Sequence, residues 1–177
     1  VMGYEIAQEA NEMYKAKEYE KAVELYEDAI QNGRKPAMIL QGARQSANID
    51  NEEYNNRGIE WLVSAFKNSC RARLMLKDVD NARRDAFAGT VFSQNMDPDA
   101  HECLAEVCAA STDKLGELQA IKAAIGQYER LEEELSKPLP GADAPARAEA
   151  AKKKSYTAGR KRELGFRIVK LERERQG

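Results

Sequence analysis

The apolar positions between residues 11 and 30 follow a helical spacing whose phase changes halfway along the segment. Aromatic and alanine side chains recur there every three or four residues, as they do on one face of an amphipathic helix. The apolar stripe moves to another face at residues 16–19. Because a continuous helix keeps its stripe on a single face, the pattern predicts two short helices joined by a turn at residues 16–18.

A pair of small residues recurs three times along the chain, and its two members are always twelve positions apart. The pairs are Ala10 and Ala22, Cys70 and Ala82, and Cys108 and Ala120. For both members, the second copy lies 60 positions after the first, and the third copy lies 38 positions after the second. Small side chains allow two packed helices to approach closely. The spacing therefore predicts three helical hairpins, with further turns at residues 77–78 and near residues 113–116.

The first copy resembles the tetratricopeptide repeat, a helical hairpin of about 34 residues. The residues that carry the resemblance are Ala10, Asn11, Tyr14, Lys15, Tyr19, Ala22, Tyr26 and Ala29. The second copy resembles the repeat through "LMLKDVDNARRDA" and the third through "DPDAHECLAEVCAA", in which Pro98 suits the first turn of a helix. The resemblance covers residues 4–135. It implies an all-α fold, a right-handed superhelix of antiparallel helix pairs (an α-solenoid), followed by a C-terminal helix.

The predicted repeat domain covers residues 1–136, with repeats near residues 4–36, 63–96 and 101–134. Residues 37–62 form an insertion, and in this respect the chain resembles the repeat domains of large immunophilins and related co-chaperones. Two interpretations of the insertion remain open: a degenerate repeat, or a lengthened helix that begins near Glu53. In the second copy, Ala86 stands at the usual aromatic position and Gly89 at the following small position, so the packing must differ there.

Charge divides the chain into an acidic body and a basic C-terminal segment. Residues 1–136 contain 16 Lys and Arg against 25 Asp and Glu, whereas residues 137–177 contain 12 against 5, so the net charges are −9 and +7. Residues 137–146 include three prolines and are expected to form a linker, because proline interrupts helices. Residues 147–177 return to a helix-forming composition, and Leu164, Ile168 and Leu171 form an apolar stripe.

The predicted C-terminal helix leaves several interpretations open. Gly159 and Gly165 weaken it, so it forms either one helix or two pieces. Opposite charges that could pair along it at i,i+4 are Glu149 and Lys153, Glu163 and Arg167, and Lys170 and Glu174. The helix either caps the last repeat, docks onto a larger assembly, or contacts nucleic acid or an anionic membrane. Nucleic acid is disfavoured because aromatic residues are scarce and acidic residues are interleaved. The basic residues available for such contacts are Lys152, Lys153, Lys154, Arg160, Lys161 and Arg162.

In the repeat family, the first helices line a concave groove that binds an extended peptide or a partner helix. The resemblance implies a partner-binding groove formed by Asn11, Tyr14, Lys15, Asn68, Arg71, Met75, Glu102 and Glu106. In co-chaperones of this family, Lys, Asn and Arg residues form a clamp there for the C-terminal carboxylates of heat-shock chaperones. Asn11 and Asn68 match that clamp, but Ala7, Glu102 and Glu106 stand where its cations belong. Because two glutamates repel a carboxylate, an acidic C-terminal peptide is not the expected partner.

The sequence offers no arrangement typical of an enzyme or of a metal or cofactor site. His101 is the only histidine, and Leu104 and Ala105 follow it at helical spacing, so it has no local metal-binding companion. No glycine-rich phosphate-binding motif occurs. Glu102 and Glu106 lie at i,i+4 and are interpreted as a solvated face. We therefore expect no catalytic residue, no metal ligand and no cofactor.

These observations favour a non-catalytic function, either a protein–protein interaction scaffold or an assembly subunit of a large multi-subunit complex. Two alternatives remain: a heat-shock-chaperone co-chaperone with a variant clamp, and a nucleic-acid-associated adaptor that uses the basic tail. No apolar run approaches the roughly 20 residues that span a bilayer, so we expect no transmembrane segment. Three cysteines without a CxxC pattern indicate buried thiols in a reducing intracellular compartment. That compartment is the cytoplasm or, if a targeting segment preceded Val1, an organelle such as a plastid or mitochondrion.

Overall fold

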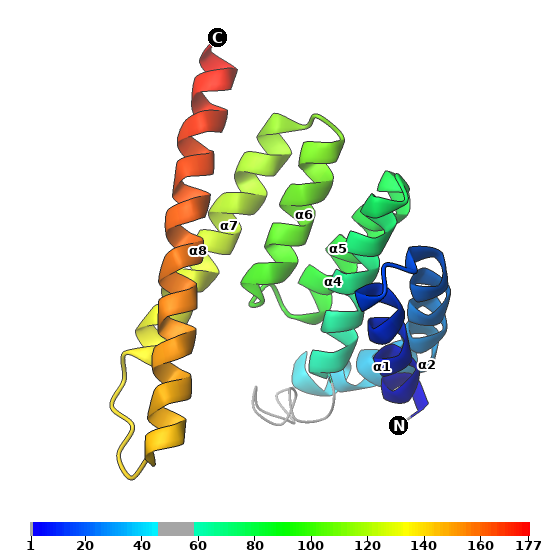
Figure 1. The fold of residues 1–177 in the computed structure, drawn as a ribbon, viewed down its shortest axis with the longest axis horizontal. Helices are drawn as coiled ribbons and strands as arrows, with labels where there is room; N and C mark the ends of the chain where they lie inside the picture. The colour runs from blue at the N-terminus through cyan, green and yellow to red at the C-terminus, as the bar shows by residue number, and fades with distance from the viewer. Residues whose placement is uncertain (1, 46–58) are drawn as a thin grey trace.

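The computed structural model describes residues 2–45 and 59–177, and these residues form helices and their connections (Figure 1). The helices are α1 (Met2–Lys15), α2 (Tyr19–Gln45), α4 (Glu60–Met75), α5 (Val79–Phe92), α6 (Pro98–Ala110), α7 (Lys114–Leu135) and α8 (Ala144–Gln176). No strand occurs in the two described ranges. The all-α class predicted from the sequence is confirmed.

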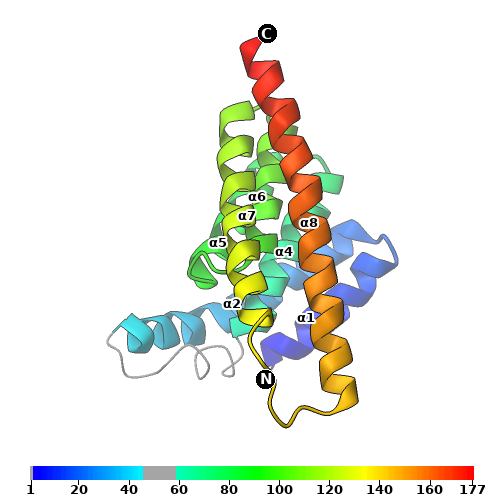
Figure 2. The ribbon, with the colours of Figure 1, turned by 90° about the vertical axis from the view of Figure 1, so that its left-hand side faces the viewer.

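Consecutive helices pack as hairpins that follow one another in chain order. Helix α1 packs against α2, α4 against α5, and α6 against α7 (Figures 1 and 2). The hairpins are joined because α2 contacts α4 and α5 contacts α6. The helices that open the hairpins also meet, since α4 contacts both α1 and α6. Helix α8 then packs along α7 and covers the last hairpin.

Each of the three hairpins turns through the same backbone motif. A residue in the left-handed conformation and the residue after it donate their N–H groups to carbonyl oxygens three and five positions earlier, as in a Schellman motif. The left-handed residues are Lys17, Lys77 and Thr112, with φ of 61°, 64° and 57°. The turns predicted at residues 16–18 and 77–78 are confirmed. The third turn lies at residues 111–113, slightly before the predicted position.

The third hairpin does not follow the register that the small-residue pairs predicted. The left-handed residues are 60 and then 35 positions apart, whereas the second interval between the pairs is 38. Ala10 and Cys70 lie seven positions before their turn residues, and the third hairpin has the fully buried Ala105 there. The register based on Cys108 is therefore wrong by three positions, although Cys108 is itself buried.

In the third hairpin, a glutamate replaces the second small residue of the pair. Ala22 and Ala82 lie five positions after their turn residues, and both are fully buried. Glu117 occupies the corresponding position of α7 and is also buried. Its carboxylate accepts a hydrogen bond from Arg167 of α8. The last hairpin is thus adapted to packing against a cationic helix.

Trp61, at the start of α4, inserts its indole ring against two glycines of the first hairpin. A Cβ atom at Gly3 would lie 2.7 Å from Cη2 of Trp61, and one at Gly33 would lie 2.5 Å from the same atom. These distances are shorter than real Cβ contacts, so the indole fits only because both positions lack a side chain. This contact fixes α4 against α1 and α2.

Helix α2 continues well beyond the first hairpin (Figure 2), and near its end Nε2 of Gln41 donates a hydrogen bond to the carbonyl oxygen of Val91 in α5 at 3.4 Å. The helix runs through Pro36, which removes one helical hydrogen bond, and ends at Gln45. The first part of the predicted insertion at 37–62 is therefore a helical extension. Residues 46–58, including the helix start predicted near Glu53, lie outside the described residues.

Helix α8 is a single uninterrupted helix. It begins at Ala144, where Asp143 caps its first turn, so the linker is residues 136–143 and the helix starts three residues before the predicted position. Gly159 and Gly165 do not divide it. The predicted apolar stripe is confirmed: Leu164 and Leu171 are buried, and Ile168 is partly buried. Within the described ranges, no helix is both long enough and apolar enough to cross a bilayer.

Candidate functional site

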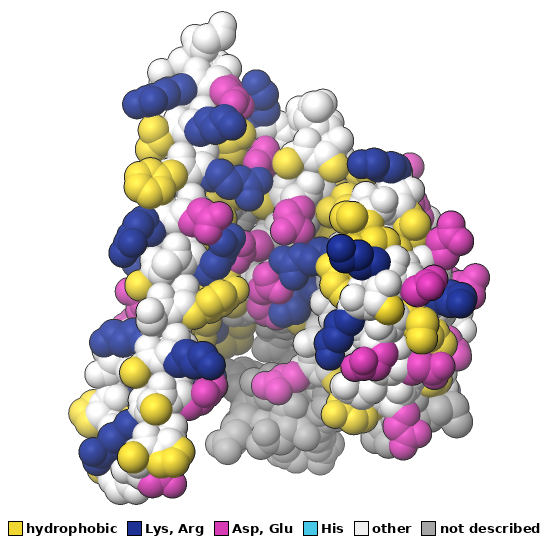
Figure 3. All heavy atoms as spheres, in the orientation of Figure 1, with side chains coloured by type: hydrophobic (Ala, Val, Ile, Leu, Met, Phe, Trp, Pro, Cys, Tyr) yellow, Lys and Arg dark blue, Asp and Glu magenta, His cyan; other side chains and the backbone are white. Residues whose placement is uncertain are grey.

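The residues predicted to line a groove come from helices that contact one another. Asn11 lies on α1, Asn68 and Arg71 on α4, and Glu102 and Glu106 on α6. We call the surface formed by these five residues the inner face. Acidic and basic side chains gather side by side in the hollow between α8 and the α1–α2 hairpin (Figure 3).

The two asparagines of the inner face bind each other. Nδ2 of Asn68 donates to Oδ1 of Asn11 at 3.1 Å, and the hydroxyl of Tyr26 donates to the same oxygen at 2.5 Å. Burial raises the pKa of Tyr26 to about 12, although its hydrogen bond with Asn68 acts in the opposite direction. The hydroxyl therefore remains protonated and holds the amide of Asn11 in place. The pair links α1, α2 and α4.

Two cations of α4, Lys67 and Arg71, are paired with carboxylates at the start and middle of α6. Nη1 and Nη2 of Arg71 donate to the two oxygens of Asp99 at 3.0 and 2.8 Å, and its Nε donates to Glu106 at 3.2 Å. Nζ of Lys67 lies 2.8 Å from Asp97 and 3.3 Å from Asp99. Burial opposes ionisation of Asp99, but the hydrogen bonds and charge of Arg71 outweigh it and lower the pKa of that carboxyl. These cations are therefore already engaged.

Glu102, at the acidic end of the inner face, is only 6% exposed, so the prediction that it lies on a solvated face is wrong. Its carboxylate accepts hydrogen bonds from the guanidinium of Arg160 on α8 and the hydroxyl of Tyr128 on α7. The hydrogen bond to Glu102 raises the pKa of Arg160 by more than burial lowers it. Burial, followed by the hydrogen bond to Glu102, raises the pKa of Tyr128. Both donors keep their protons, so the protein's own C-terminal helix neutralises this carboxylate.

Three predicted groove residues stay outside this network. Tyr14 is half-buried and packs edge-on against Tyr19, with ring centroids 5.7 Å apart. Lys15 is exposed and lies 3.2 Å from the carboxylate of Glu12. Met75 is 58% exposed. All three lie at the ends of α1 and α4, beside the turns.

The six basic residues predicted for tail contacts divide into two sets. Arg160 and Lys161 point toward the body, where Arg160 binds Glu102 and Nζ of Lys161 lies 3.2 Å from Glu132. The exposed residues are Lys152, Lys153, Lys154 and Arg162. Part of the basic tail is therefore used to dock α8, and the remainder faces solvent.

A cavity of about 300 Å³ lies between α1 and α4, next to the inner face. Its lining residues are Tyr4, Ala7, Gln8, Asn11, Glu60, Trp61, Ser64 and Ala65. They supply aromatic, amide and hydroxyl groups and one carboxylate, with no cation among them. Sequence reasoning missed this cavity. The one available indication was Ala7, whose small side chain stands where a clamp would have a lysine.

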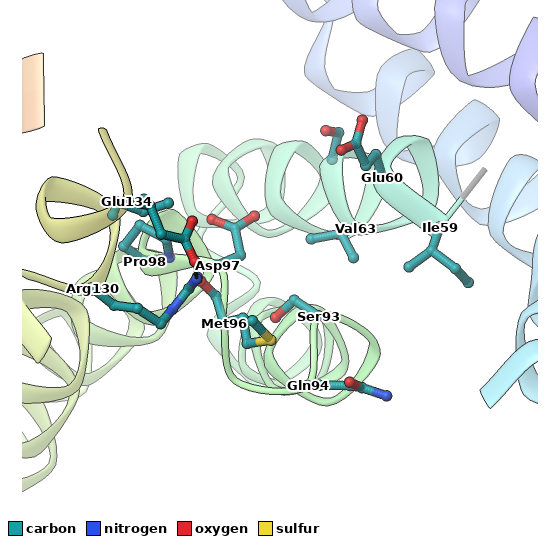
Figure 4. A pocket seen from close by; sticks show the side chains of 12 residues that line it. Ile59, Glu60, Val63, Ser93, Gln94, Met96, Asp97, Pro98, Arg130 and Glu134 are labelled. Carbon is teal, nitrogen blue, oxygen red and sulfur yellow. Dashed lines mark hydrogen bonds and ion pairs between the residues drawn. The ribbon is translucent and has the colours of Figure 1, made fainter. Parts of the chain in front are cut away.

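A larger cavity of about 560 Å³ lies between the start of α4, the α5–α6 connection and the end of α7 (Figure 4). Arg130 reaches across it and donates to the carbonyl oxygen of Met96 at 3.2 Å and to Glu134 at 2.9 Å. Ile59, the first residue described after 46–58, forms part of its wall. We assign this cavity no ligand.

The potentially reactive side chains have structural partners. Nε2 of His101 donates to the carbonyl oxygen of Asn95 at 2.9 Å. Cys70, Cys103 and Cys108 are free and buried. A hydrogen bond with Cys70, together with burial, raises the pKa of Cys103, which disfavours a thiolate. Across residues 2–45 and 59–177, no cluster of three or more His, Cys, Asp or Glu is placed to hold a metal ion.

No protein-family model matches the chain, and no curated protein sequence or solved structure matches it. The function is therefore inferred from the geometry of this chain.

Proposed function

We propose that this chain is a non-catalytic scaffold for protein–protein interaction, built from tetratricopeptide-like hairpins, that binds a neutral or basic segment of a partner protein. The observation that carries the proposal is the cavity between α1 and α4, which lies beside an inner face whose one cation, Arg71, and the neighbouring Lys67 are already paired. Its volume, about 300 Å³, is at the lower end for ligand pockets and suits one or two side chains of a bound peptide.

The recurring turn motif supports the likeness to tetratricopeptide repeats. Identical turns at Lys17, Lys77 and Thr112 connect the two helices of each hairpin in the same way, and the first helices of neighbouring hairpins contact each other. In stacked hairpins, this surface is the one that meets an extended peptide or a helix. The cavity lies between the first two of these helices.

The charges beside the cavity decide which kind of segment fits. Arg71 and Lys67 already form charge-assisted bonds with Asp97, Asp99 and Glu106. An acidic peptide would have to displace these carboxylates and would regain only equivalent bonds. The cavity wall itself contributes the carboxylate of Glu60, which attracts a cation. The same pairs disfavour a co-chaperone with a variant clamp, because such a clamp needs cations that are free to bind.

The test is affinity capture from native extract with quantitative mass spectrometry. Ser64 is exposed and lines this cavity as well as the larger one at the start of α4, so Ser64→Phe obstructs both cavities without entering the core. Ala123 is exposed on α7, and Ala123→Phe is the matched control. We expect at least one partner captured by the wild type and by Ala123→Phe to be lost with Ser64→Phe. Capture that is equal for all three proteins would contradict the proposal.

A further inference from the structure

The two sides of α8 have different environments. Leu164 and Leu171 are buried in a cluster with residues of α7. On the opposite side, Phe166 is 70% exposed and Val169 is 47% exposed. No other helix in the described part of the chain covers them, since the only extensive packing of α8 is against α7. An apolar pair is thus left in solvent in the second half of a long helix.

The exposed side of α8 has the spacing of a surface that pairs with another helix. Its residues follow one another at alternating intervals of four and three positions, and all are exposed: Ser155, Gly159, Arg162, Phe166, Val169 and Arg173. We call this set the outer seam. Intervals of three and four keep side chains on one stripe facing a partner helix. The small residues allow a second backbone to approach, and Phe166 and Val169 supply apolar contact.

The outer seam is electropositive. Arg162 and Arg173 belong to it, Lys152 and Lys170 flank it, and no carboxylate of the described residues forms an ion pair with any of these four cations. The nearby acidic residues are engaged elsewhere, because Glu163 pairs with Arg160 and Glu174 with Lys114. The potential of this surface therefore attracts an acidic partner.

We infer that the outer seam is a docking site for an acidic amphipathic helix of a partner protein. Apolar side chains of that helix cover Phe166 and Val169, and its carboxylates pair with Arg162 and Arg173. The two arginines are eleven positions apart in α8, about 16 Å along the axis, so the partner helix spans at least three turns. This surface is separate from the cavity between α1 and α4, and it gives the proposed scaffold a second binding site.

Other occupants fit the outer seam less well. Pairing with the same surface of a second copy brings arginine-bearing stripes together, and like charges repel. Stacking of single-stranded RNA needs several closely spaced aromatic rings, whereas Phe166 is the only aromatic residue of the seam. A helix lying on a membrane needs a broad apolar face, whereas this one has two apolar residues.

The test measures fluorescence anisotropy of two designed helical peptides with the full chain. Both carry leucines at alternating intervals of three and four, and one has glutamates and the other lysines at the flanking positions. We expect the glutamate peptide to bind and the lysine peptide to bind much more weakly. Phe166→Ser, and separately Arg162→Glu with Arg173→Glu, should weaken binding of the glutamate peptide by roughly tenfold or more. Phe87→Ser is the matched control, because Phe87 is an exposed phenylalanine of α5 (61%).

Several outcomes would overturn the inference. These are failure of the glutamate peptide to bind, equal binding of the two peptides, and binding that Phe166→Ser leaves unchanged. A preference for oligouridine RNA or phosphatidylserine vesicles over the glutamate peptide would assign the seam to another partner. Self-association in sedimentation that Phe166→Ser abolishes would assign it to a second copy. Ser64→Phe should not affect peptide binding to the outer seam, so this result and that of the cavity test are independent.

Discussion

Arg160 of α8 and Glu102 of α6 form an ion pair across 58 positions of the sequence. The pair places a cation of the C-terminal helix on a buried carboxylate at the acidic end of the inner face. Tyr128 of α7 donates to the same carboxylate, so three helices meet at this point. Helix α8 is therefore bound to the body by a specific charge contact as well as by its apolar stripe.

Removing the cation should leave Glu102 buried without its charge partner. We expect Arg160→Met to lower the free energy of unfolding by about 1–3 kcal/mol, because a buried carboxylate that has lost its cationic partner is costly. Urea denaturation followed by circular dichroism measures this change.

The matched control is the double variant Arg160→Met with Glu102→Gln. The amide oxygen of the glutamine still accepts a hydrogen bond from the hydroxyl of Tyr128, and the amide carries no charge. Most of the lost stability should therefore return. Equal stabilities of the wild type and Arg160→Met would show that the pair does not stabilise the docking of α8.

Asp99 should make the stability depend on pH in acid. Its pKa in the folded protein is lowered from the ordinary value of 3.8, so its ionised form stabilises the fold above that pH. This contribution is lost as the pH falls below about 4 toward the lowered pKa. We expect Asp99→Asn to cost about 1–2 kcal/mol at neutral pH and progressively less in acid. Other carboxylates titrate in both the wild type and Asp99→Asn, so their contributions cancel in the difference between the two unfolding free energies. If that difference stays constant as the pH falls, this role of Asp99 is refuted.

Gly33→Ala should destabilise the contact between α4 and the first hairpin. The added methyl group would collide with the indole of Trp61, and we expect a cost of about 1–3 kcal/mol. Gly126→Ala is the control, because nothing lies near its Cβ position in α7, and it should stabilise the protein by about 0.5–1 kcal/mol. Thermal unfolding of both variants checks the prediction, which is incorrect if Gly33→Ala also stabilises.

The thiols should react slowly in the native protein. Cys70, Cys103 and Cys108 are buried, and burial raises the pKa of Cys108. Labelling with iodoacetamide, resolved by peptide mass spectrometry, should be slow for all three residues and become fast after unfolding in urea. Rapid native labelling of Cys70 or Cys103 would contradict the packing of α4 against α6.

The sequence pattern predicted the hairpins because apolar phase and small residues depend on local packing. The change of apolar phase located the turn at Lys17, and the spacing of the small-residue pairs located the turn at Lys77, even though the left-handed residues there are not glycines. The pattern misplaced the third register because Glu117 occupies a position where the first two hairpins have alanine. Arg167, which donates a hydrogen bond to the buried carboxylate of Glu117, lies 50 positions later in the chain. A pattern of local spacing cannot reveal such a distant partner.

The candidate site was predictable only in part for the same reason. Asn11, Asn68 and Arg71 lie on two helices, α1 and α4, that contact each other. Whether these groups are free depends on partners far away in the chain, as when Arg71 binds Asp99 across 28 positions. The predicted pair of Glu163 and Arg167 within α8 is replaced in the same way, because Arg167 binds Glu117. Tertiary pairing overrides the weaker helical i,i+4 interaction.

The most direct test of the proposed scaffold uses Trp61, the only tryptophan, which lines the cavity. Random peptides displayed on phage are selected on the full chain carrying Phe166→Ser, which disables the outer seam, and the enriched peptides are titrated while Trp61 fluorescence is followed. We predict neutral or basic peptides that change the fluorescence of the wild type and of Ala123→Phe, and that fail to bind Ser64→Phe. Enrichment of acidic C-terminal peptides, or binding that Ser64→Phe leaves intact, would contradict the proposed function.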